Sequence, residues 1–60
     1  MIKIRIVTKK NFRNEVFVDG LYAYESFLHR NAEAKNLKSL IKLLQLDGKV
    51  EIVGDEEKEQ

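Results

Sequence analysis

The fold is decided by residues 15–24, which read Glu15-Val16-Phe17-Val18-Asp19-Gly20-Leu21-Tyr22-Ala23-Tyr24. An Asp-Gly pair between two runs of β-formers predicts a hairpin with a two-residue type I′ turn, because both central residues of that turn need positive φ. The turn sets the register, and directly opposed residues share a face of the sheet. We therefore expect one face to carry Val16, Val18, Leu21 and Ala23, and the other to carry Glu15, Phe17, Tyr22 and Tyr24.

Two other segments alternate with the period of two that is typical of a strand. Residues 1–8 place Ile2, Ile4 and Ile6 on one face and Lys3, Arg5 and Val7 on the other. Residues 49–53 alternate as a last strand, with Val50 and Ile52 pointing inward.

A helix is predicted over residues 36–46, because Leu37, Leu40, Ile41 and Leu44 follow the spacing of one helical face. Gly48 follows as a stop signal. Extending the helix back to Ser26 places Arg30 and Glu33 on the apolar face, so we expect a break near Asn31. The start of the helix stays open between Ser26 and Asn36.

The order of these elements predicts an α+β fold, with a small, mainly antiparallel sheet (β-β-β-α-β) and one helix packed on one face. We expect Leu37, Ile41 and Leu44 to pack on Ile4, Val18 and Ile52. The chain has 60 residues and no cysteine, which predicts one domain without disulfides. We expect a compact domain over residues 1–53 and a disordered acidic tail over residues 54–60, which contain no apolar side chain.

Few chemistries are indicated by the composition. His29 is the only histidine, the three glycines are scattered, and no serine or threonine lies in a nucleophile motif. We therefore expect no enzyme, no catalytic residues, no metal site, no cofactor and no small-molecule substrate. The net charge is +1, and no apolar run is long enough to span a bilayer. The expectation is a soluble cytoplasmic protein that does not bind a membrane.

One helix covers only one face of a sheet, so the other face needs an explanation. We expect that face to form a partner interface containing Arg5, Val7, Phe17, Tyr22, Tyr24 and Val53. An apolar patch of this kind is typical of a homodimer or of a site for a larger protein.

Two alternatives stay open for this face. In the first, the aromatic rings stack nucleic-acid bases, and phosphates are held by Lys3, Arg5, Lys9, Lys10 and Arg13. The carboxylates of Glu15 and Glu51 count against this alternative, because they repel phosphates. In the second, the sheet curls, and Phe12, Phe27 and the long side chains cover the rings within one monomer.

Overall fold

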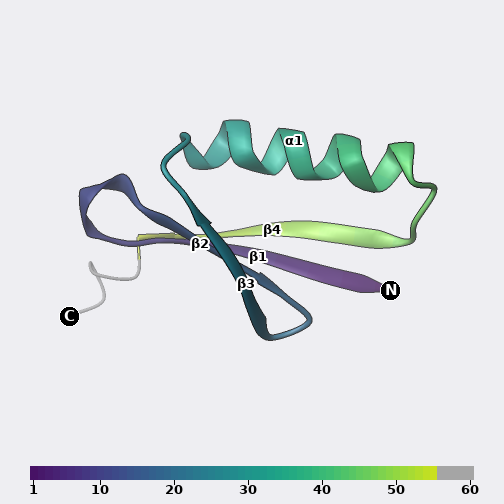
Figure 1. Cartoon of the computed structure of the whole chain (residues 1–60), viewed down its shortest axis with the longest axis horizontal. Helices are drawn as coiled ribbons and strands as arrows, with labels where there is room; N and C mark the ends of the chain where they lie inside the picture. Colours follow the sequence, from purple (N-terminus) through teal and green to yellow (C-terminus); the bar gives the residue numbers. More distant parts are fainter. Residues whose placement is uncertain (56–60) are drawn as a thin grey trace.

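The computed structural model describes residues 1–55, which form a four-stranded sheet and one α-helix (Figure 1). The elements in chain order are β1 (Ile2–Thr8), a short 3-10 helix η1 (Lys10–Phe12), β2 (Asn14–Val18), β3 (Leu21–Ser26), α1 (Arg30–Leu43) and β4 (Gly48–Asp55). The fold is α+β with the helix packed on the sheet, as predicted from the sequence. Within this part of the chain, no helix has the length and hydropathy that a membrane crossing needs.

The sheet is mixed, with the strand order β3-β2-β1-β4. The pairs β1–β2 and β2–β3 are antiparallel, whereas β1 and β4 are parallel. The parallel pair follows from the connection through α1, since parallel strands need a long crossover and antiparallel strands do not. The sheet is thus mainly antiparallel, as predicted, and the one parallel pair lies at its β4 edge.

The predicted turn at the tip of the β2–β3 hairpin is confirmed. Asp19 and Gly20 both have positive φ, at 51° and 85°, and Val18 lies opposite Leu21. Asp19 also ties the tip to β1, because its N–H donates to the Lys3 carbonyl at 2.7 Å and its Oδ1 accepts from the Lys3 N–H at 2.9 Å. The turn thus holds β1 and β2 in register as well as β2 and β3.

A β-bulge at Ala23 changes the face of the following residue. Phe17 pairs with Tyr22 as predicted, but the next pair is Val16 with Tyr24, so Ala23 is an extra residue in β3. Tyr24 therefore shares a face with Val16, which lies in the core under the helix. The predicted placement of Tyr24 beside Phe17 is wrong, because a one-residue insertion reverses the alternation beyond it.

The core lies between α1 and the sheet. Its buried members are Ile4, Ile6, Val16 and Ala34, and the partly buried residues packed against them are Ile2, Val18, Leu37, Ile41 and Val50. The predicted packing of Leu37 and Ile41 is thus confirmed. Leu44, the C-cap of the helix, is 56% exposed, and Ile52 is 42% exposed. The predicted core roles of Leu44 and Ile52 are wrong.

The helix begins at Arg30, six positions before the start of the segment predicted as helical. His29 is the N-cap, and its Nδ1 accepts a hydrogen bond from the Asn31 N–H at 3.1 Å. The loop between β3 and α1 is fixed to β2 by a hydrogen bond, in which Nδ2 of the buried Asn14 donates to the Leu28 carbonyl. The first turn of α1 therefore has contacts that the apolar pattern does not indicate.

The last strand is longer than predicted. β4 continues to Asp55, two residues past residue 53, after a bulge at Val53 that offsets its register with β1. Gly54, at φ 97°, follows the bulge. Residues 54 and 55 thus belong to the sheet, and the rest of the predicted tail, residues 56–60, lies outside the described residues.

Candidate interaction surfaces

The face of the sheet away from α1 carries a pair of aromatic rings. Phe17 and Tyr22 lie opposite each other on β2 and β3, with ring centroids 5.8 Å apart and ring planes at 76°. This is an edge-to-face contact, the arrangement that the ring quadrupoles favour. Phe17 is half-buried, but Tyr22 is 55% exposed. Arg5 lies beside Phe17 on β1, as the sequence predicts.

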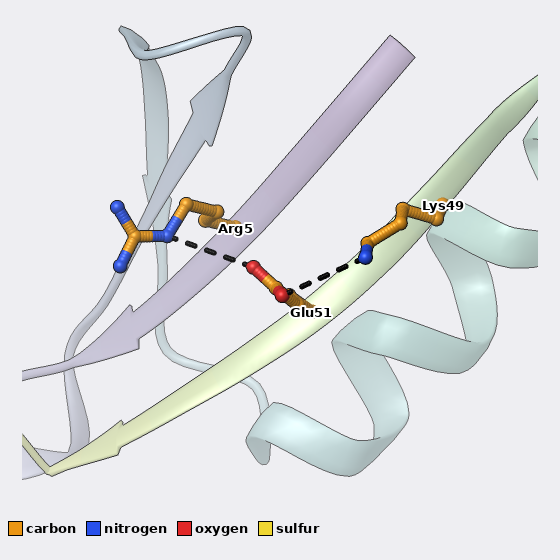
Figure 2. A network of polar contacts seen from close by, with 3 residues as sticks. All are labelled: Arg5, Lys49 and Glu51. Carbon is orange, nitrogen blue, oxygen red and sulfur yellow. Dashed lines mark ion pairs between the residues drawn. The ribbon is translucent and has the colours of Figure 1, made fainter. Parts of the chain in front are cut away.

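Charged side chains of both signs surround these rings. Glu51 lies between Arg5 and Lys49, with 3.8 Å from its carboxylate oxygens to Arg5 Nε and to Lys49 Nζ (Figure 2). Each such exposed ion pair adds little stability. What matters for recognition is that basic and acidic groups lie side by side. We define the sheet face as Lys3, Arg5, Phe17, Tyr22, Lys49 and Glu51.

The other three residues predicted for this interface differ from these in burial, register or face. Val7 is buried, so its side chain is not available at the surface. Tyr24 lies on the helix side because of the bulge at Ala23. Val53 is the bulged residue of β4 and is partly exposed. Of the predicted set, Arg5, Phe17 and Tyr22 are direct cross-strand neighbours.

The two phenylalanines that were candidates for covering the rings are themselves exposed. Phe12 is 83% exposed and Phe27 is 69% exposed. A side chain that covers a neighbouring ring loses much of its own solvent contact. The alternative in which these two residues close the sheet face within one monomer is therefore wrong.

The basic residues predicted for nucleic-acid contact fall into two places. Lys3 and Arg5 lie on the sheet face, while Lys9, Lys10 and Arg13 surround η1, where the Lys9 N–H donates to the Arg13 carbonyl at 2.7 Å. Carboxylates lie close to both arginines: Arg5 faces Glu51, and Arg13 lies 3.3 Å from Glu15 and 3.9 Å from Glu25. These carboxylates reduce the positive potential that phosphate binding requires.

A partly buried polar cluster joins β3 to the first turn of α1. Glu33 is buried, and its carboxylate accepts hydrogen bonds from the Tyr24 hydroxyl and, at 2.7 Å, from Ser26 Oγ. Burial, together with the hydrogen bond to Glu33 and its charge, raises the pKa of Tyr24 above its usual range. The sequence analysis missed this cluster because it treated Glu33 as incompatible with the core face. The only signal was the presence of two hydroxyl side chains in the preceding segment.

Replacing Tyr24 by phenylalanine is expected to remove part of the loss of stability at high pH. Tyrosine ionises in the unfolded chain near pH 10, about its model value, whereas the folded chain holds this proton to higher pH. The contribution of Tyr24 is therefore complete below that pH and is lost as the pH rises. Urea unfolding at pH values from about 8 to about 11 measures the slope.

The matched control is Tyr22→Phe, because Tyr22 lies on the sheet face and has no hydrogen bond to Glu33. This control should keep the alkaline slope of the parent chain. Equal slopes in the two variants would contradict a specific role of the Tyr24 hydroxyl.

The carboxyl end of α1 exposes several leucines that the sequence analysis placed in the core or did not use. Exposure lies between 45% and 77% for Leu40, Leu43, Leu44 and Leu46. Residues 37–46 contain six apolar side chains, more than one helical face can bury. That surplus is the signal for a second apolar surface.

Within residues 1–55, no three histidine or acidic side chains gather closely enough to hold a metal ion.

No family model, no curated protein and no solved structure matches this chain.

Proposed function

We propose that this chain is a non-enzymatic protein-interaction module that pairs with a second copy of itself through the sheet face. The observation that carries the proposal is the Phe17–Tyr22 ring pair with its exposed Tyr22, which lies among charges of both signs on the side that α1 leaves uncovered. Aromatic residues are enriched where protein surfaces meet, because a ring buries a large area with few rotatable bonds.

Self-association is favoured over other occupants by the charge pattern. A two-fold axis places each patch against its own image, so a patch of one sign repels itself and a patch of both signs does not. Here the carboxylate of Glu51 lies in one patch with the cations of Arg5 and Lys49, so each copy offers a carboxylate to the cations of its image. Nucleic acid prefers a continuous cationic surface, and here Glu15, Glu25 and Glu51 lie among the cations. Nucleic-acid binding is therefore the less well supported proposal.

The size of the core supports the same proposal. The core cluster contains four buried residues, which is a small core for a stable domain. Chains of this length without disulfides or metals gain stability by association. Among the residues that the structure describes, more large hydrophobic side chains are exposed than buried. A second copy would cover part of that surface.

The test replaces the two rings together. We expect the parent chain to sediment as a dimer at high micromolar concentration, and Phe17→Ser/Tyr22→Ser to sediment as a monomer, because each copy loses its apolar contact. Since Phe17 is half-buried, the more exposed Tyr22→Glu serves as a second variant, with circular dichroism to show that it is folded.

The control is Leu43→Ser, which removes an exposed leucine from α1 and leaves the sheet face intact. It should still dimerise. A parent chain that stays monomeric, or a dimer that Leu43→Ser abolishes and Tyr22→Glu does not, would contradict the proposal. Salt-sensitive binding of a single-stranded oligonucleotide by a monomeric parent chain would favour the alternative function.

A further inference from the structure

We propose that the outer edge of β4 docks an extended acidic peptide from another protein, which joins the sheet as an added strand beside α1. This surface is separate from the sheet face, so the inference goes beyond the proposed self-association. Three features of the described residues carry it: an unpaired strand edge, an uncovered apolar side chain on that strand, and a row of lysines on the adjacent helix.

The first feature is the edge itself. β4 stands at the end of the sheet order, and among the described strands only β1 pairs with it. Its register with β1 is regular from Gly48 to Ile52, before the bulge at Val53. The N–H and C=O groups on the other side of such a strand form a template for one more strand, and peptides use that template in β-augmentation.

The second feature is Ile52. Its register partner is Ile6, a fully buried core residue, so Ile52 points toward the helix side of the sheet. Ile52 is nevertheless 42% exposed, which means that α1 leaves its side chain partly uncovered. In an added strand, alternate side chains also point to the helix side, and one of them would pack against Ile52.

The third feature is the lysine row. Lys35, Lys38 and Lys42 are all exposed, and at 100° per residue they lie on one flank of α1. The opposite flank contains Glu33, which contacts Tyr24 and Ser26 of β3 at the other edge of the sheet. The helix runs along β4 (Figure 1). We infer from the helical spacing that the lysines face away from β3 and toward the outer side of β4.

These lysines make the edge selective for negative charge. No acidic residue occurs between Ala34 and Leu46, and no described residue forms an ion pair with the three lysines. An acidic peptide on the edge of β4 would bring its carboxylates close to all three cations. Charge complementarity of this kind accelerates association and rejects basic competitors.

A second copy of this chain fits the edge less well than a peptide does. Pairing β4 with its own image would bring two α1 helices together, each with its lysine flank toward the other. That arrangement sets like charges face to face and gives the second helix little room. An extended peptide contains no helix and avoids both problems.

The test uses a synthetic peptide of about nine residues, a strand length that is common in proteins. Every second residue faces α1 and is aspartate, except for one central valine that packs against Ile52, and the residues between them are threonine. We expect fluorescence anisotropy to show binding that weakens with added salt. Lys38→Glu/Lys42→Glu should weaken binding by at least about tenfold, because reversed charges repel the peptide. The matched control Lys10→Glu changes an exposed lysine on η1 and should bind as the parent chain does.

The site of binding is checked by amide chemical shifts, which should change most in β4 and around Lys38. Changes centred on Phe17 and Tyr22 instead, or equal binding of a peptide with lysine in place of aspartate, would overturn the proposal. Binding to phosphatidylserine vesicles without binding to the peptide would also overturn it, in favour of an anionic membrane surface. The Tyr22→Glu variant separates the two proposals, since it should bind the peptide whether or not the chain dimerises.

Discussion

Ile6→Ala is expected to lower the free energy of unfolding by about 2–5 kcal/mol. Ile6 is fully buried, lies on the central strand β1 and belongs to the core cluster under α1. Truncation removes apolar contacts and leaves a cavity that the surrounding strands fill only in part. A domain of this size is stable by roughly 3–9 kcal/mol, at about 0.05–0.15 kcal/mol per residue, so the variant should lose a large share of its stability.

Urea unfolding followed by circular dichroism measures the change, with Leu44→Ala as the matched control. Leu44 is an aliphatic residue of similar size at the exposed carboxyl end of α1, outside the core cluster. Its truncation should change stability by no more than about 0.5 kcal/mol. Similar losses in the two variants would mean that the core extends to the end of the helix, contrary to the observed packing.

The hairpin could be predicted because its cause is local. The Asp-Gly pair fixes the turn, and the turn fixes the first cross-strand pairs, including Phe17 with Tyr22. The bulge at Ala23 could not be predicted, because its consequence is a contact with α1: it turns Tyr24 toward Glu33, nine positions further along the chain. Alternation alone contains no information about such an insertion.

The apolar pattern located α1, left its start open between Ser26 and Asn36, and placed its end three residues too late. At its start, Glu33 was counted against a helix because a carboxylate on the core side is costly without partners. The partners exist, in Tyr24 and Ser26, and they make the early start of the helix favourable. At its end, Leu44 continues the apolar spacing, yet the helix stops before it and the strands do not cover it.

The sequence predicts which residues of the candidate interface share a face of the sheet, but not which of them are exposed. Arg5, Phe17 and Tyr22 share a face because the turn and the alternation place them there. Val7 was predicted on that face as well, but exposure is a property of the folded surface, and this residue is buried. The lysine flank along β4 depends on where α1 lies over the sheet, which the spacing of apolar residues does not determine.

Glu33→Ala is expected to lower the free energy of unfolding by about 1–3 kcal/mol. The change leaves the Tyr24 hydroxyl and Ser26 Oγ without their shared acceptor, and it removes a negative charge from the first turn of α1, where the helix dipole favours one. Glu25→Ala is the control, since Glu25 is an exposed residue of β3 in a long ion pair with Arg13 and should change stability by no more than about 0.5 kcal/mol.

A double-mutant cycle separates the hydrogen bond from the loss of the side chain. If Tyr24 and Glu33 act together, the loss in Tyr24→Phe/Glu33→Ala is smaller than the sum of the two single losses, because the second change has no hydrogen bond left to remove. Additive losses, or equal losses in Glu33→Ala and Glu25→Ala, would contradict this account. A measured coupling between Tyr24 and Glu33 would support a different account of the helix start. In that account, the hydrogen bonds of the cluster stabilise a helix that begins at Arg30, although Glu33 places a carboxylate on the core side of the helix.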